Sequence, residues 1–95
     1  MHVREMISTH PHVQGQTNDA LLACIEACYD CAQTCTSCAD ACLGEENNGM
    51  LIQCIRRNLD CADICAATGA IASRRTGSNT EVMRAVIQAL SLIHI

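Results

Sequence analysis

The sequence predicts an all-α protein, an antiparallel helical hairpin followed by the start of a third helix. Three observations predict this class. Cysteines recur at helical spacing in two stretches, a short polar segment containing glycine separates these stretches, and helix-start signals precede the first and third expected helices. With 95 residues, the chain has room for a single domain over 1–95. It has no Phe, no Trp and one Tyr, so its core must rely on close backbone approach.

Residues 1–16 form a polar extension ahead of the first long helix. Val3, Met6 and Ile7 have the spacing of one amphipathic helical turn. We therefore expect at most one turn of helix in this extension.

A first long helix is expected over residues 17–43. Thr17, Asn18 and Asp19 supply a capping residue and an acidic first turn, and Gly44 suits the left-handed position that follows many helices. Six cysteines inside it step by 4, 3, 4, 3 and 4 residues. At about 100° per residue, their sulfurs share a face roughly 80° wide. They are Cys24, Cys28, Cys31, Cys35, Cys38 and Cys42.

A second long helix is expected over residues 50–75, after the polar turn 45–49. The positions Cys54, Asn58, Cys61 and Cys65 repeat the 4, 3, 4 spacing, with an amide in one thiol position. A short connector between the helices lets the two thiol rows face each other.

The end of the second helix carries two further signals. Arg74 and Arg75 are placed to interact with the negative end of the helix dipole, and Gly77 ends the helix. Gly69 costs about 1 kcal/mol relative to Ala inside a helix. It indicates either a close contact or simple tolerance of glycine.

A third helix is expected to start over residues 79–90. Ser78 and Glu81 have the spacing of a capping box. Four residues give this helix its expected apolar face: Val82, Ala85, Val86 and Ala89.

Composition and charge exclude several classes of protein. The net charge of −4 argues against a nucleic-acid partner, no apolar run can span a membrane, and the N-terminus lacks the apolar core of a secretory signal. We therefore expect a cytoplasmic protein. In that reducing compartment, nine cysteines indicate metal ligands or redox groups before disulfides.

Two helices and the start of a third do not close a bundle, because the thiol rows need further helices to cover them. The last six residues, 90–95, resemble translated adapter DNA used in sequencing libraries. We expect the natural sequence to depart near Leu90 and to continue into a fourth helix; the alternative is a genuine apolar tail. His94 is not counted as a ligand in either case.

The stretches CIEACYDCAQTCTSCADAC (24–42) and CIRRNLDCADIC (54–65) resemble the cytosolic branch of the four-helix-bundle copper-storage proteins, a family also labelled cysteine-rich and ferredoxin-like. The resemblance covers roughly 17–89. It implies a four-helix bundle with a Cys-lined core that binds many Cu(I) ions and associates into homo-oligomers. The implied ligands are the nine cysteines only. The family pattern continues with a further Cys-rich helix and a His-containing stretch, which are absent here.

Thiolates are soft ligands that select Cu(I), zinc or iron–sulfur clusters. Cu(I) accepts two or three sulfurs, so i, i+4 pairs along one helix suffice, whereas zinc needs four ligands at once. Straight helical rows also suit an iron–sulfur cluster poorly. Two interpretations without a metal stay open: a disulfide-stapled hairpin with CxxxC pairs Cys38/Cys42 and Cys61/Cys65, and a core that merely uses cysteine as a small apolar residue.

No arrangement of nucleophile, base and orienting group predicts catalysis, so we expect a non-enzyme. Four other residues have two interpretations each. His10 and His12 can guard the mouth of a bundle or lie free on the surface, Met50 can offer a thioether or pack, and Asn58 can tune a thiolate or pack between helices. The polar residues opposite the thiol rows are expected to form solvated faces. They are Glu26, Asp30, Gln33, Ser37, Asp40, Arg56, Arg57, Asp60 and Asp63.

Overall fold

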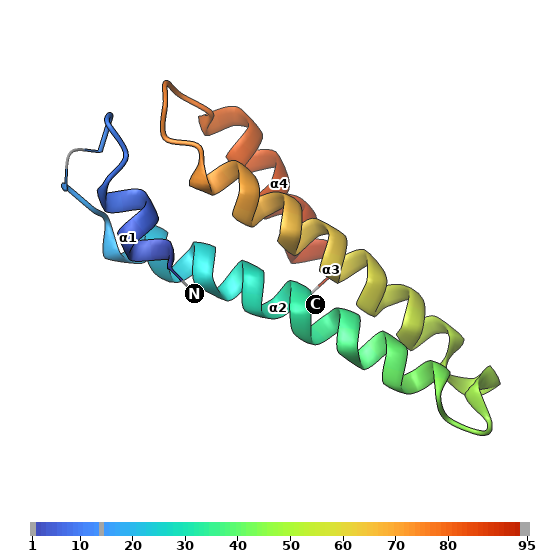
Figure 1. Cartoon of the computed structure of the whole chain (residues 1–95). Coiled ribbons are helices and arrows are strands. Elements are labelled where there is room, and N and C mark those ends of the chain that lie inside the picture. The colour runs from blue at the N-terminus through green and yellow to red at the C-terminus, as the bar shows by residue number, and fades with distance from the viewer. Residues whose placement is uncertain (1, 14, 94–95) are drawn as a thin grey trace.

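The computed structural model describes residues 2–13 and 15–93, and these residues form helices and connecting turns (Figure 1). The elements, in chain order, are α1 (Val3–Ser8), α2 (Asp19–Leu43), the 3-10 helix η1 (Asn48–Leu51), α3 (Ile52–Ser73) and α4 (Thr80–Ile93). Helices α2 and α3 lie antiparallel along the long axis of a molecule that measures 52 × 26 × 16 Å. The prediction of an all-α hairpin with a third helix is confirmed, and none of the described helices is long and apolar enough to cross a membrane.

Helix α2 begins where the capping signal predicted it. The Asn18 side-chain oxygen accepts hydrogen bonds from the backbone N–H groups of Ala20 (2.9 Å) and Leu21 (3.2 Å), which satisfies two of the free donors at the helix start. The helix ends at Leu43. The expected left-handed conformation at Gly44 is wrong, because this residue has φ −78° and ψ −9° and its N–H prolongs the helical pattern towards Asp40 and Ala41.

Helix α3 is shorter at both ends than the range expected from the sequence. Its start is preceded by the turn of η1, and Ile52 is its first residue. Its last residue is Ser73, since Arg74 already has an extended backbone. Neither Arg74 nor Arg75 lies in the last turn, so the predicted interaction with the helix dipole is wrong. The Arg75 guanidinium instead donates to the Asn79 side chain at 3.4 Å, in the connector to α4.

Helix α1 packs against the hairpin at the end opposite the 44–51 turn. Val3 and Ile7 are 1% and 2% exposed, while Met6 between them is exposed. The Arg4 guanidinium also forms an ion pair of 2.8 Å with Asp19 at the start of α2. The sequence predicted one amphipathic turn here, and the structure adds that this turn helps to form the aliphatic core, which consists of Val3, Ile7, Leu22, Ile25 and Ala72.

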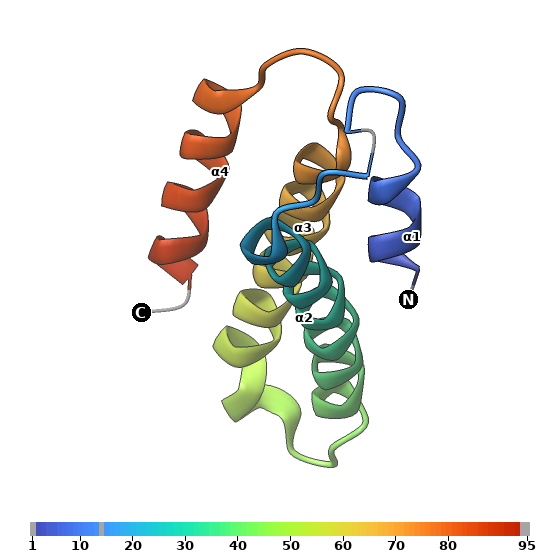
Figure 2. The same ribbon diagram turned by 90° about the vertical axis from the view of Figure 1, so that its left-hand side faces the viewer.

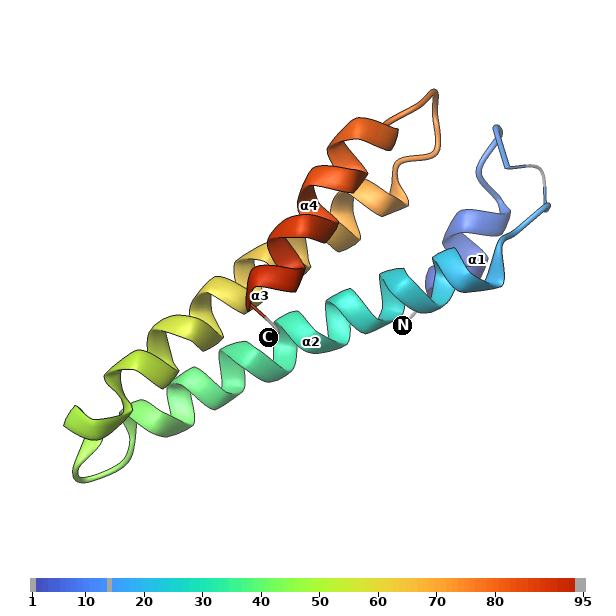
Figure 3. The ribbon, with the colours of Figure 1, turned by 180° about the vertical axis from the view of Figure 1, so that it is seen from behind.

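Helix α4 lies beside α3, across the hairpin end from α1 (Figure 2). It covers only part of the hairpin's length, and its last turn ends about level with the middle of the hairpin (Figure 3). Its expected apolar face is partly wrong. Val82 and Ala85 are exposed, and the residues turned towards the rest of the molecule are the half-buried Met83, Val86, Ala89, Leu90 and Ile93.

The predicted capping box at the start of α4 is also wrong. The helix begins at Thr80, so Asn79 rather than Ser78 directly precedes it, and Glu81 is its second residue rather than the third. The Ser78 hydroxyl lies 3.3 Å from the Thr80 hydroxyl, and the Asn79 side-chain amide donates to the carbonyl of Ile71 at 2.8 Å. Asn79 therefore ties the start of α4 to the end of α3.

The single aromatic residue explains the glycine inside α3. A Cβ atom added to Gly69 would lie 3.1 to 3.3 Å from three ring carbons of Tyr29 on α2. Gly69 is buried, and Tyr29 packs against the aliphatic core. Of the two interpretations of Gly69, the close contact therefore holds.

We expect the substitution Gly69→Ala to destabilise the reduced, metal-free protein by about 1–3 kcal/mol, because the new methyl group overpacks the Tyr29 ring. Denaturant unfolding under anaerobic conditions measures the change. Gly49→Ala is the matched control, because a Cβ there meets nothing within 4 Å. Equal stability of the two variants would show that the Tyr29 ring moves aside without cost.

Candidate metal centre

The nine cysteines differ in burial along the hairpin. None of the nine, all of which lie in the described part of the chain, forms a disulfide. The buried ones are in the half of the hairpin that α4 flanks, and the exposed ones are towards the 44–51 turn. Cys28, Cys61 and Cys65 are buried, Cys24, Cys31, Cys35 and Cys42 are half-buried, and Cys38 and Cys54 are exposed.

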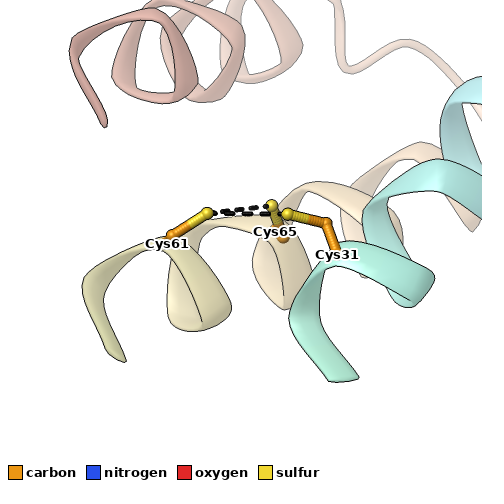
Figure 4. Close-up of side chains that lie close together, drawn as sticks. All are labelled: Cys31, Cys61 and Cys65. Atoms are coloured by element: carbon orange, nitrogen blue, oxygen red, sulfur yellow. Dashed lines mark hydrogen bonds between the residues drawn. The ribbon is translucent and has the colours of Figure 1, made fainter. Parts of the chain in front are cut away.

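Three of these thiols meet between the two long helices. The sulfur atoms of Cys31 on α2 and of Cys61 and Cys65 on α3 all lie within 4.8 Å of one another (Figure 4). The Cys31 and Cys61 sulfurs are 3.5 Å apart, and those of Cys61 and Cys65 are 3.9 Å apart. Cys35 extends the group, with its sulfur 3.7 Å from that of Cys31. We call Cys31, Cys61 and Cys65 the thiol trio.

The thiol trio confirms that the two rows approach each other and adds the register between them. The 4, 3, 4 spacing places i, i+4 pairs such as Cys31/Cys35 and Cys61/Cys65 on one helix face. It carries no information on which residue of α2 lies opposite which residue of α3. That register depends on the length of the turn and on the packing of Tyr29 against Gly69, so the contact between Cys31 and Cys61 could not be predicted from spacing.

Burial changes the acidity of the thiols. It is the main cause that raises the pKa of Cys28 and Cys61 to about 11, and the pKa of Cys35 and Cys65 to about 12, from the usual 9.0. Burial also acts on Cys31, but hydrogen bonds from Cys65, Cys61 and Cys35 outweigh it and lower the pKa of Cys31. Cys31 is therefore the member of the group that most readily becomes a thiolate.

The end of the hairpin near the turn is more open. The Asn58 side-chain amide donates to the Cys54 sulfur at 3.6 Å, so this amide contacts a thiol of its own row. Burial and the neighbouring Cys54 raise the pKa of Cys42 on the opposite helix. Met50 is 86% exposed in the turn, so its side chain is not part of the core.

The two histidines of the N-terminal segment lie at the other end of the molecule. The Nδ1 atom of His10 accepts a hydrogen bond of 3.0 Å from the backbone N–H of His12, and its Nε2 atom lies 3.3 Å from the Thr76 hydroxyl. The structure thus uses His10 to connect the N-terminal segment to the α3–α4 connector. The residues predicted to form solvated faces on α2 and α3 are all exposed.

An apolar hollow borders the thiol trio on the side of α4. Its lining includes Leu90, a residue that the cysteine spacing does not connect to the thiols. A helical hairpin whose interior presents thiols at contact distance is typical of proteins that bind soft metal ions. The chain belongs to the copper storage protein family, because the family model described as "Copper storage protein" matches residues 17–92.

Solved structures agree with this assignment. The chain is 47% identical to the copper storage protein Ccsp from Streptomyces lividans loaded with 10 copper equivalents, with a TM-score of 0.87, and the match covers 96% of this chain and 70% of that one. A second structure of the Streptomyces lividans protein, with five coppers, is 52% identical over 79% of this chain and 62% of that one, with a TM-score of 0.75. No curated protein sequence matches the chain.

We expect the metal-free protein to lose stability as the pH rises above about 9. The pKa of Cys28 and Cys61 is about 11 in the folded chain, against 9.0 in the unfolded chain. Between these values the folded chain keeps protons that the unfolded chain has lost, so the unfolding free energy falls with increasing pH. Thermal unfolding of the reduced protein between about pH 7 and about pH 10 measures this slope.

A variant in which Cys28, Cys61 and Cys65 are replaced by Ala is the control. It should lose the part of the pH dependence above pH 9 that these three thiols cause, while Cys35 keeps its own contribution. If its slope matches that of the unchanged protein, the buried thiols do not cause the effect.

Proposed function

We propose that this protein stores Cu(I), bound by the thiolates of its nine cysteines: Cys24, Cys28, Cys31, Cys35, Cys38, Cys42, Cys54, Cys61 and Cys65. The observation that carries the proposal is the thiol trio. It brings sulfurs from both helices to the separation that one small, soft cation can bridge. Cys35, in contact with Cys31, allows a neighbouring ion to share a sulfur, so ions can follow one another along the hairpin.

Charge favours Cu(I) over zinc at these sites. The trio is buried or half-buried, and the nearest basic side chains along α3, Arg56 and Arg57, are exposed. Zinc held by four thiolates leaves two uncompensated negative charges, which are costly to bury. Monovalent copper ions that share thiolates approach neutrality, and they need only two or three sulfurs each.

Membership of the family and the similar Streptomyces lividans structures support storage as the role. We further propose that the protein is cytoplasmic, as the resemblance to the cytosolic branch implies, and that it is not an enzyme. We also propose that copies associate. Exposed apolar side chains on α4, namely Val82, Ile87 and Leu92, support association because contact between copies would cover them.

An anaerobic titration with Cu(I) against a competing Cu(I) chelator tests the proposal. We expect several tightly bound equivalents per chain. The double variant Cys31→Ser/Cys61→Ser should bind its tightest equivalent at least about tenfold, or about 1.4 kcal/mol, more weakly, because two of the three sulfurs of the trio are gone. Cys38→Ser/Cys54→Ser is matched to it, with one thiol removed from each helix, and should keep that tightest site. Uptake of a single weak equivalent by the unchanged protein would refute copper storage.

Restoring the missing thiol should change copper capacity. Asn58 occupies a position in the α3 thiol row next to Cys54. We therefore expect Asn58→Cys to increase the copper bound per chain at saturation and Asn58→Ser, which adds no thiolate, to leave it unchanged. Copper analysis after gel filtration measures both. An equal capacity for the two variants would mean that position 58 does not line the metal sites.

A further inference from the structure

The thiol trio has a shape that copper does not require. Cu(I) accepts three sulfurs but needs only two, and here three sulfurs from two helices converge within 4.8 Å. Two of the three sulfur–sulfur separations, 3.5 Å and 3.9 Å, are close to van der Waals contact. Such a compact triangle fits a cation that forms three short bonds to sulfur on one side of itself.

The surroundings of the trio favour a product without charge. Cys61 and Cys65 are 5% and 2% exposed. A complex of three thiolates with one monovalent ion has a net charge of −2, and a complex with one divalent ion has a net charge of −1. Only a trivalent centre gives a neutral complex, and burial favours that complex.

We propose that Cys31, Cys61 and Cys65 form a binding site for trivalent arsenic, presented as arsenous acid, As(OH)3. Each of the three S–H bonds and each of the three As–O bonds breaks, and three As–S bonds form. Every thiol proton leaves with an arsenic hydroxyl group as water, so the products are one neutral As(S-Cys)3 centre and three water molecules. Arsenic stays trivalent, and the exchange needs no oxidant or reductant.

The third sulfur sets this site apart from the other thiols. An i, i+4 pair on one helix offers two sulfurs, so arsenic bound there keeps one hydroxyl group. The trio offers three sulfurs from a preorganised scaffold, and the third bond closes without a further loss of translational freedom. The adjoining apolar hollow of about 280 Å³ leaves space beside the Cys31 and Cys65 sulfurs for the non-bonding electron pair of arsenic; it is lined by Cys24, Ala27, Cys28, Cys31, Cys65 and Leu90.

The test uses the whole, reduced, metal-free chain and one equivalent of sodium arsenite under anaerobic conditions. Intact mass measurement should show an adduct of one arsenic atom that has replaced three hydrogens. Free thiols are then alkylated, arsenic is removed with a dithiol, and the released thiols are labelled with a second reagent. We expect the second label on Cys31, Cys61 and Cys65. A second label confined to an i, i+4 pair, or an adduct that keeps a hydroxyl group, would overturn the proposal.

Two matched double variants test the same site by retention of arsenic. Cys31→Ser/Cys61→Ser should retain arsenite at least tenfold more weakly than the unchanged chain, whereas Cys38→Ser/Cys54→Ser should retain it as well as the unchanged chain does. Phenylarsine oxide, which binds two thiols, should bind both variants alike and shows that each still presents paired thiols. Equal retention of arsenite by the two variants would refute a three-sulfur site.

The proposal is independent of copper storage. It uses three of the same thiols but requires no bound copper, and its readout is the mass and the labelled positions of the arsenic adduct. If the Cu(I) titration fails but a three-sulfur arsenic adduct forms, only copper storage is refuted. If the Cu(I) titration succeeds but no three-sulfur arsenic adduct forms, only the arsenic site is refuted.

Discussion

The contact between the Cys31 and Cys61 sulfurs across the hairpin, at 3.5 Å, is the interaction on which the metal chemistry of this structure depends. Thiols are small and only weakly polar, so two helices can bring them together without unsatisfied hydrogen-bonding groups. The same contact leaves sulfur atoms as neighbours that a metal ion can bridge. A larger aliphatic residue at either position would fill this space, and a charged one would lose solvation on burial.

The thiols between α2 and α3 are small side chains, so their burial gives limited hydrophobic stabilisation. The end of the molecule where α1 packs supplies more. Val3 and Ile7 of α1 join Leu22, Ile25 and Ala72 there, and the Tyr29 ring packs on Gly69. Burial of a large apolar side chain contributes about 1.5–3 kcal/mol, so this cluster is a substantial part of a small domain's stability. The aliphatic end thus holds the hairpin together while the thiol end remains free to respond to metal.

Much of this architecture could be predicted from the sequence, because it depends on local signals. The 4, 3, 4 spacing predicted both long helices and the face that each turns inward, and Asn18 predicted the start of α2. The failures arose where tertiary contacts decide. Gly44 adopts a helical conformation, Arg74 and Arg75 lie beyond the end of α3, and α4 turns Met83 and Leu90 inward instead of Val82 and Ala85. The pairing of Cys31 with Cys61 could not be predicted for the same reason, because the register between helices is set by packing and not by spacing.

The protonation of the thiols links the fold to its cargo. In the metal-free chain, burial raises the pKa of Cys35 and Cys65 to about 12, so most of the thiols between α2 and α3 are neutral and can stay buried near neutral pH. Cys31 differs, because hydrogen bonds from its neighbours lower the pKa of its thiol. A cation that binds first at Cys31 therefore displaces the proton that this group loses most readily, and each later thiolate is stabilised by a cation already present. Loading can then proceed outward from the trio without these thiols ever holding a large uncompensated charge.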